Sequence, residues 1–494
     1  MKSLSKITLF NQFISSLLFF LLVVIILQLV SSSTASVSPV TSPFVYTNSM
    51  AVKERKEAEA LLKWKTSLHI KSQSLLSSWA GSTPCNWVRI NCDNSGSVTH
   101  LNLSTYGLRG MLQNLNFQSF PNLLSLDLSS NSLYGTIPSN ISHLSKLLVL
   151  DLSANQFTGS IPASLGNLSN LTILYLYKNQ LSGSIPEELG MLSSLSELVL
   201  SENNLIGVIP PSLGSLSNLT LLYLFKNQLS SSIPQELGMQ SSLSDLDLSS
   251  NNLTGAIPAS LGNLRNLTLL HLFKNQLSGS IPQELGILSS LSAIPVSLGN
   301  LSNLTILYLY KNQLSGSIPE ELGMLSSLKL GMLSSLSDLD LSLNNLTGVI
   351  PASLGNLRNL TTLYLFKNQL SGSIPQELGM LSSLSELALS SNNLTGVIPA
   401  SLGNLSNLNT LHLFENHLSG SIPQELGMLS PLSSLWLSSN NLTGVIPASL
   451  GNLRNLTFLH LNKNQLSGSI PHELGMLNSL RRLVLSSNNL TIVQ

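Results

Sequence analysis

An asparagine recurs every 24 residues along most of this chain, within the pattern L-x-x-L-x-L-x-x-N. A first run holds Asn131, Asn155, Asn179, Asn203, Asn227, Asn251 and Asn275, and a second holds Asn312, Asn344, Asn368, Asn392, Asn416, Asn440, Asn464 and Asn488. A fixed period of this length is typical of a solenoid, in which similar coils stack along one axis. Such a stack presents one long, regular surface, which favours the binding of a partner over catalysis.

Composition supports this interpretation. The chain has 494 residues, more than one compact core usually holds, but a solenoid escapes that limit because each coil covers its neighbours. Charged residues make up 9% of the chain and cancel to a net charge of zero. This balance gives no indication of nucleic acid or of an acidic substrate as a partner.

The first residues predict export. Lys2 and Lys6 precede an apolar run from Ile14 to Val30, and the small residues Ser33 and Ala35 follow it. This order is typical of a secretory signal peptide, which we assign to residues 1–35. An uncleaved membrane anchor is the alternative, because the run is long for a signal peptide. No second apolar run follows the repeats, so no transmembrane helix is expected after them.

The two cysteines, Cys85 and Cys92, are expected to form a disulfide in an exported chain. Closing so short a loop is worth roughly 2–3 kcal/mol in the chain-entropy estimate. Two free thiols are the alternative.

A cap is expected ahead of the repeats. Residues 36–53 contain Pro39 and Pro43 and predict a linker, and residues 54–100 predict the cap. Its helix should run from Glu54 to His69, with one face formed by Ala58, Leu61, Leu62, Lys65 and Leu68. The first coil of a solenoid needs such a cover because its apolar end would otherwise meet water.

One repeat shows how each coil is built. In the segment LTILYLYKN, Leu171, Leu174 and Leu176 are expected to point inward, each worth about 1.5–3 kcal/mol when buried. Alternation from Ile173 to Tyr177 predicts a short strand, and such strands from successive coils should pair in parallel. Asn179 should satisfy backbone groups where the chain leaves the strand, which is a structural role. Gly183 and Pro186 then turn the coil to its convex side.

Two irregularities interrupt the repeats of residues 101–494. The interval from Asn275 to Asn312 is 37 residues, two repeats less 11, and the missing stretch corresponds to DLDLSSNNLTG. We therefore expect a coil within residues 281–301 to lack its strand, leaving a gap in the strand ladder. The interval from Asn312 to Asn344 is 32 residues, because LGMLSSL is repeated within residues 322–337, where we expect a bulge or loop. The last repeat is incomplete.

These motifs resemble a known family. The repeat is similar to the plant-type leucine-rich repeat, and EAEALLKWKTSL followed by SSWAGSTPCNWVRINC resembles the amino-terminal cap of plant receptor-like kinases and receptor-like proteins. The resemblance implies an α/β solenoid: a right-handed, curved horseshoe or superhelix with a parallel concave sheet and a helical cap. It also implies an ectodomain truncated before any membrane span or kinase. Arg89 stands where the family's cap has glycine, and a positive φ there would cost about 1 kcal/mol or more.

Candidate binding residues lie at the x positions of L-x-L-x-x-N, which should face the concave side. Aromatic residues are only 5% of the chain, yet about half of them fall there, and exposed aromatics mark interaction surfaces. The candidates are Tyr175, Tyr177, Lys178, Tyr223, Phe225, Lys226, His271, Phe273, Lys274, Tyr308, Tyr310, Lys311, Tyr364, Phe366, Lys367, His412, Phe414, Trp436 and His460. Such rows suit an extended peptide with acidic or aromatic side chains. Duplication of one harmless motif is the alternative.

Asn-x-Ser/Thr sequences are abundant and predict glycans on an exported chain. They begin at Asn102, Asn140, Asn167, Asn170, Asn218, Asn252, Asn266, Asn300, Asn303, Asn345, Asn359, Asn393, Asn404, Asn441, Asn455 and Asn489.

No enzyme, cofactor or metal site is predicted. The paired carboxylates Asp245 with Asp247, and Asp338 with Asp340, have a spacing of about 6–7 Å along a strand, which would suit glycoside hydrolysis. An open sheet cannot exclude water from them, however, so we do not assign catalysis.

The function that the resemblance implies is an extracellular, peptide-recognising ectodomain acting in signalling or defence. Its partners would be a peptide or protein ligand and a leucine-rich-repeat co-receptor kinase, with no nucleic acid. It would act in the secretory pathway, at the outer face of the plasma membrane or outside the cell. The alternatives are a secreted inhibitor of a pathogen cell-wall hydrolase and a non-functional truncated duplicate.

Overall fold

The computed structural model describes residues 46–286, 303–324 and 335–491. The described residues from Lys53 onward belong to one compact unit. The predicted signal segment lies outside the described residues. No helix in the described part of the chain has the length and apolar character needed to span a membrane.

Two α-helices begin the described chain, α2 (Tyr46–Ser67) and α3 (Ile70–Leu75). The predicted linker is therefore wrong over its last residues, because α2 begins eight residues before Glu54. Turn and breaker residues end at Pro43, and nothing after them opposes a helix.

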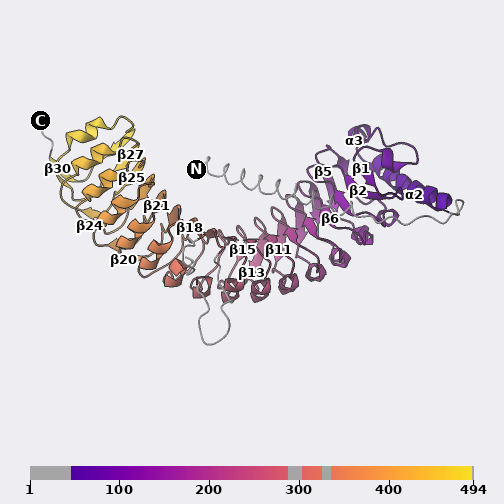
Figure 1. The fold of residues 1–494 in the computed structure, drawn as a ribbon, viewed down its shortest axis with the longest axis horizontal. Helices are drawn as coiled ribbons and strands as arrows, with labels where there is room; N and C mark the ends of the chain where they lie inside the picture. The colour runs from indigo at the N-terminus through magenta and orange to yellow at the C-terminus, as the bar shows by residue number, and fades with distance from the viewer. Residues whose placement is uncertain (1–45, 287–302, 325–334, 492–494) are drawn as a thin grey trace, which may run out of the picture. The chain divides into compact units, whose positions relative to one another are not determined.

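A 17-stranded sheet runs along the molecule, with its strands side by side in Figure 1. Strand β2 pairs antiparallel with β1, and every later pair is parallel and in register, as in Leu222 opposite Leu246. Its strands are β1 (Ile90–Cys92), β2 (Val98–Asn102), β4 (Ser125–Asp127), β6 (Val149–Asp151), β8 (Ile173–Tyr175), β10 (Glu197–Val199), β12 (Leu221–Tyr223), β14 (Asp245–Asp247), β16 (Leu269–His271), β17 (Ile306–Tyr308), β18 (Asp338–Asp340), β19 (Thr362–Tyr364), β21 (Glu386–Ala388), β23 (Thr410–His412), β25 (Ser434–Trp436), β27 (Phe458–His460) and β29 (Arg482–Val484). The predicted parallel solenoid is confirmed.

Short strands also form where each coil leaves the sheet, and they pair with the same segment of the next coil. One group is β3 (Arg109–Gly110), β5 (Ser132–Thr136), β7 (Gln156–Gly159), β9 (Gln180–Gly183), β11 (Asn204–Gly207), β13 (Gln228–Ser231) and β15 (Asn252–Leu253). The remaining pairs are β20 (Ser371–Ser373) with β22 (Asn393–Thr395), β24 (Ser419–Gly420) with β26 (Asn441–Leu442), and β28 (Ser467–Ser469) with β30 (Asn489–Thr491). Gly183 has a φ of 75°, as the turn out of the strand requires.

The side of each coil opposite the sheet holds a 3-10 helix rather than an α-helix. Pro258, for example, precedes the helix Ala259–Asn263, whose length leaves room for little more than one turn. Gly262 lies in this helix, and a Cβ atom there would come within 2.3 Å of the Glu284 carbonyl oxygen in the next coil. The coils therefore stack closely on this side because glycine recurs there.

The core is a column of leucines, one set from each coil. Leu171, Leu174 and Leu176 are completely buried, and so are their equivalents through Leu461 in the coils that the structure describes. Each leucine packs against those of the coils before and after it, as the sequence predicts. Stability is therefore distributed along the axis, coil by coil.

The recurring asparagine binds backbone groups of its own coil and of the coil before it. The Asn251 side-chain amide donates to the carbonyl oxygens of Leu224 (3.0 Å) and Leu248 (3.1 Å). Its Oδ1 accepts from the Leu229 N–H at 3.0 Å. The predicted structural role is confirmed, since without this side chain these buried groups would have no such partner.

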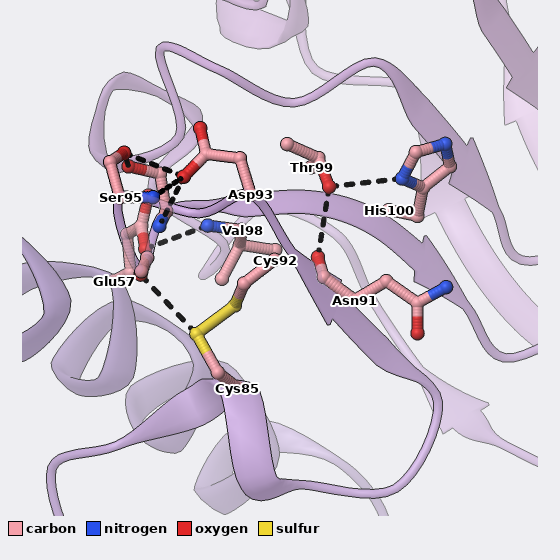
Figure 2. The surroundings of a disulfide bond; sticks show 11 residues. Glu57, Cys85, Asn91, Cys92, Asp93, Ser95, Val98, Thr99 and His100 are labelled. Carbon is pink, nitrogen blue, oxygen red and sulfur yellow. Dashed lines mark hydrogen bonds between the residues drawn. A yellow bond between two sulfur atoms is a disulfide. The ribbon is translucent and has the colours of Figure 1, made fainter. Parts of the chain in front are cut away.

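The cap packs three tryptophans into its core. The rings of Trp79 and Trp87 stack with centroids 5.6 Å apart, and Trp64 of α2 lies 6.3 Å from Trp79. The disulfide between Cys85 and Cys92 is present, as predicted (Figure 2). Arg89 has a φ of 66°, so the strain expected at the family's glycine position is confirmed.

Glu57 of α2 is completely buried beside this disulfide. Its Oε2 accepts from the Val98 N–H at 3.0 Å, whereas its Oε1 has no partner among the described residues. Burial raises the pKa of Glu57 from its ordinary 4.5 to about 7, despite the opposing effect of the Val98 N–H.

The expected gap in the strand ladder is wrong. Strand β16 pairs directly with β17, with His271 opposite Tyr308, and β17 pairs with β18. Residues 281–286 keep the regular conformation, with Ile281 buried and a 3-10 helix at Gln283–Leu285. The ladder is therefore closed between His271 and Tyr308. The rest of the irregular coil and most of the duplicated LGMLSSL segment lie outside the described residues.

Candidate ligand-binding face

One face of the 17-stranded sheet carries the predicted binding residues. We call it the ring face. In β8, the side chains of Ile173 and Tyr175 point to this face and Leu174 points to the core. Tyr177 and Lys178 continue the row just beyond the strand. Each coil therefore presents four positions across the face, and strand pairing aligns each position with its equivalent in the next coil.

The ring face has two kinds of strand. Ring strands carry an aromatic residue or histidine at the position that Tyr175 occupies in β8. They are β8, β12, β16, β17, β19, β23 and β27. Spacer strands lie between them and carry smaller residues at the same positions, with one exception, and they are β10, β14, β18, β21 and β25. Because the two kinds of strand alternate, most ring strands stand two strands apart.

The predicted aromatic residues are less exposed than expected. All of them are half-buried except His271, which is 8% exposed, so their description as exposed is wrong. The two rings of one strand contact each other edge-on, as Tyr175 and Tyr177 do at 6.1 Å. Neighbouring side chains also cover them, which a repeat considered alone does not reveal.

The predicted lysines are exposed and hold an unusual backbone conformation. Their φ angles lie between 52° and 56° at Lys178, Lys226, Lys274, Lys311 and Lys367. This left-handed residue aims the side chain outward just before the ladder asparagine. Lys274 Nζ lies 5.7 Å from the centre of the Phe273 ring, and Lys226 Nζ lies 3.2 Å from Glu202.

Rings of different strands meet where β16 adjoins β17. His271 stacks on Tyr308 with centroids 4.9 Å apart, and Phe273 stacks on Tyr310 at 4.5 Å. The interplanar angles are 2° and 7°. We call these four side chains the ring block. It exists because the irregular coil contributes no spacer strand, so two ring strands become neighbours.

A second stack forms around Trp436, the large residue on spacer strand β25. Its ring lies between His412 (4.5 Å) and His460 (4.7 Å), nearly parallel to both. Burial lowers the pKa of His412 to about 4, so this imidazole is neutral at neutral pH. Trp436 shows that one planar group fits between rings that stand two strands apart.

Carboxylates line the side of the ring face where the strands begin. The Tyr175 hydroxyl donates to Glu197, and the Tyr364 hydroxyl donates to Glu386. Asp247 Oδ2 lies 3.2 Å from His271 Nδ1. The sequence analysis missed Glu197 and Glu386, although the period of two along a strand places them on the same face as Val199 and Ala388.

Asp340 differs from these acids in its partners. Its Oδ1 accepts from the Ser342 N–H at 2.9 Å and from the Ser342 hydroxyl at 2.6 Å. No other side chain in the described residues bonds to it. Burial raises the pKa of Asp340 to about 6, despite the opposing effect of Ser342. The ring face therefore holds carboxylates where the strands begin, as at Glu197 and Glu386, and lysines along the other side. The rings lie between them, and Asp247 and Asp340 stand within the row of rings.

Ten of the sixteen predicted glycan acceptors fall into two groups by their surroundings. Asn252, Asn345, Asn393, Asn441 and Asn489 are exposed beside the ladder asparagine. The amides of Asn170, Asn218, Asn266, Asn303 and Asn455 instead donate to a carbonyl oxygen of the preceding coil. Asn300 lies outside the described residues.

Family comparisons agree with the cap and the coils. Residues 55–93 match the family described as the leucine rich repeat N-terminal domain. Leucine rich repeat matches cover residues 121–181 and 430–490, and further matches recur between residues 194 and 429.

Sequence relatives and solved structures are similar to parts or most of the chain. The LRR receptor-like serine/threonine-protein kinase RGI3 of Arabidopsis thaliana is 40% identical over 93 residues, 18% of this chain and 8% of that protein. The crystal structure of PEPR1-AtPEP1 is similar with 39% identity and a TM-score of 0.81, covering 88% of this chain and 59% of that one. The plant peptide hormone receptor RGFR1 in complex with RGF2 matches with 35% identity and a TM-score of 0.59, over 82% of this chain and 72% of that one.

Proposed function

Because the chain belongs to the leucine-rich-repeat family, with the cap and repeats of plant receptor ectodomains, we propose that it binds an extended peptide on its ring face. The observation that carries the proposal is the row of rings that recurs from β8 to β27, with carboxylates where the strands begin and lysines beyond the strand ends. Each ring offers apolar area with little conformational freedom to lose on binding. The charged sides orient a ligand through its own charges.

The comparison with RGFR1, described as a peptide hormone receptor in complex with RGF2, supports the peptide as the class of ligand. The ring face is also open along its length, so an extended chain fits it better than a small molecule that needs enclosure. We therefore assign recognition rather than catalysis to this face.

Recognition would take place outside the cytosol. The Cys85–Cys92 disulfide is typical of oxidising compartments, and the exposed acceptors beside the ladder asparagines are accessible to glycans. Secretion or attachment to the outer face of the plasma membrane both satisfy this proposal.

The test uses peptides selected from a random twelve-residue display library on the folded protein. We expect the dissociation constants of the selected peptides to rise at least tenfold when Tyr308, Tyr310 and Tyr364 are all changed to Ala, because the peptide would lose its contacts with three rigid aromatic rings. Synthetic peptides titrated by calorimetry give the constants, and thermal melts show that the variant folds.

The matched control changes Met191, Met239 and Met428 to Ala. These side chains are also large, apolar and exposed, but they lie on or beside the 3-10 helices. Affinity should not change in this control. Selected peptides that respond to the methionine changes instead, or a library from which none is enriched, would refute peptide recognition on the ring face.

A further inference from the structure

The spacer strands differ in what stands between their flanking rings. In β25, Trp436 fills the position, and its ring contacts His412 on one side and His460 on the other. The equivalent position holds Asp247 in β14, Asp340 in β18 and Ala388 in β21. These residues are much smaller than tryptophan, so the space between the flanking rings is not filled by the chain in the same way.

Strand β18 has rings on both sides. Tyr308 and Tyr364 are the partners of Asp340 in the register of β17, β18 and β19. Parallel strands stand about 4.8 Å apart, so the backbones of β17 and β19 flank β18 at the same spacing as the backbones of β23 and β27, which carry His412 and His460, flank β25. No ring contact joins Tyr308 to Tyr364 among the described residues.

The Tyr364 ring is held away from β18. Its hydroxyl donates to Glu386, which belongs to β21 on the opposite side of β19. Tyr308 is held by its stacking on His271 of β16, again on the side away from β18. Both walls of the Asp340 position are therefore fixed by contacts that do not involve β18.

The other spacer positions are less suited to a cation. Asp247 is already paired with His271 at 3.2 Å, and Glu197 and Glu386 already accept a tyrosine hydroxyl. The last residues of β10 and β21, at the position equivalent to Asp340, are Val199 and Ala388, which carry no charge. Asp340 thus combines a carboxylate with two ring walls and with no bonding partner except Ser342 in the described chain.

We propose that the Asp340 position between Tyr308 and Tyr364 binds the guanidinium group of an arginine side chain. This assignment deepens the proposed function and rests on it for the source of the arginine, a peptide lying along the ring face. The guanidinium is planar, as the Trp436 indole is, and it stacks on aromatic rings. The Asp340 carboxylate supplies the opposite charge and accepts charge-assisted hydrogen bonds.

The proposal also revises the expected ligand. Lysines along one side of the face suggested acidic side chains in the peptide. The Asp340 carboxylate, which lies in the row of rings, adds a requirement for at least one basic side chain. A peptide that binds here would therefore carry both signs of charge, arranged across its width.

The test needs no selected peptide. The probes are the capped tripeptides acetyl-Gly-Arg-Gly-amide and acetyl-Gly-citrulline-Gly-amide, because citrulline keeps the planar shape of arginine without its charge. Protein containing 3-fluorotyrosine reports on binding by fluorine NMR, and Tyr308→Phe and Tyr364→Phe assign the two signals. We expect the arginine tripeptide to shift both signals saturably and the citrulline tripeptide to bind at least fivefold more weakly.

Variants separate the site from the rest of the face. Asp340→Asn should weaken the arginine tripeptide at least fivefold, and Asp340→Trp should abolish binding because it copies the filled position of Trp436. Asp127→Asn is the matched control. Asp127 also accepts from the N–H and hydroxyl of a serine two residues later, but its register partners in the neighbouring strands are Asn102 and Asp151 rather than rings. Its change should leave binding unaltered, and melting curves verify the folding of each variant.

Two results would overturn the assignment: equal binding of the arginine and citrulline tripeptides, or binding that survives Asp340→Trp. If the selected peptides still depend on the tyrosines in that case, the peptide function stands and only the arginine position falls. If the arginine tripeptide binds as expected but the library yields no peptide, the guanidinium site stands and the proposed function falls.

Discussion

At the scale of single residues, the repeat depends on conformations that most residues avoid. The residue before each ladder asparagine is left-handed, and lysine, serine, glutamate, alanine or leucine occupies that position instead of glycine. Each such residue is strained relative to glycine. The asparagine that follows supplies several hydrogen bonds to buried backbone groups, which offsets this cost in every coil.

Arg89 carries the same strain without a ladder asparagine after it. We expect Arg89→Gly to raise the free energy of unfolding of the cap by about 0.5–1 kcal/mol, because relief of the positive φ exceeds the added freedom of glycine in the unfolded chain. Urea unfolding followed by tryptophan fluorescence measures it, since Trp64, Trp79 and Trp87 all lie in the cap. Arg89→Ala keeps a Cβ atom at this φ. An equal gain in that control would show that loss of the arginine side chain, and not the backbone, is responsible.

The residue scale also separates what the sequence predicts well from what it does not. Leu174, Asn179 and Gly183 recur with a fixed period, and their roles follow from the repeat alone. The hydrogen bonds from Tyr175 to Glu197 and from Tyr364 to Glu386 join side chains of neighbouring coils. Such contacts depend on which coils become neighbours and on how far each side chain leans, and a single repeat contains neither fact.

At the scale of elements, the cap joins its helix to the sheet through a buried acid. Glu57 on α2 accepts from the Val98 N–H at the start of β2, and three tryptophans in mutual contact pack into the same cap. Burial favours the protonated form of the Glu57 carboxyl group over the ionised form. The packing of α2 against the sheet therefore depends on pH. The helical pattern predicted the face of α2 but placed no acid in it.

Glu57 should make the cap more stable in acid. Its pKa is raised in the folded state, so the stabilisation is fully present below about pH 4.5 and is lost as pH rises through about 7. Between pH 5 and 8 we expect the free energy of cap unfolding to fall by roughly 2–3 kcal/mol. Glu57→Gln should remove most of this dependence, as measured by urea unfolding at several pH values.

The matched control for that experiment is Glu59→Gln. Glu59 lies on the same helix but is exposed and pairs with Arg55 at 3.1 Å. Its change should leave the dependence on pH intact. A slope that persists in Glu57→Gln would show that another group binds the proton.

At the scale of the whole molecule, the ladder accommodates an irregular coil without breaking. The sequence located this coil correctly, because the interval between asparagines is short by 11 residues. It did not predict the direct pairing of β16 with β17. A count of residues does not show whether the strands on either side of an irregular coil pair with each other or stay apart. The ring block forms because β16 and β17 are neighbours, so the sequence did not predict it either.

Restoring the missing stretch should separate the ring block. We expect insertion of DLDLSSNNLTG between Ser292 and Ala293 to add a spacer strand between β16 and β17, because this sequence forms β14 and its turn elsewhere. The assay places cysteines at positions 271 and 308, which are register partners about 5 Å apart. They should form a disulfide under mild oxidation in the uninserted chain and remain thiols after insertion, where about 10 Å separates them.

Cysteines at positions 175 and 223 provide the control for thiol titration. Strand β10 stands between them in both proteins, so they should stay reduced throughout. Disulfide formation between positions 271 and 308 in the inserted chain would mean that the extra segment does not enter the sheet.

The ring block has a consequence for how a ligand finds its place. A surface with perfect translational symmetry offers a bound chain many equivalent registers, shifted from one another by whole repeat pairs. A ligand on such a surface would bind in several equivalent registers, and neither of its ends would have a defined position on the protein. Contact between β16 and β17 breaks that symmetry at one point among the described coils, as the filled Trp436 position does nearer the last strand. If the proposed peptide binds here, these two irregular positions would distinguish one register from the others for a ligand long enough to reach them.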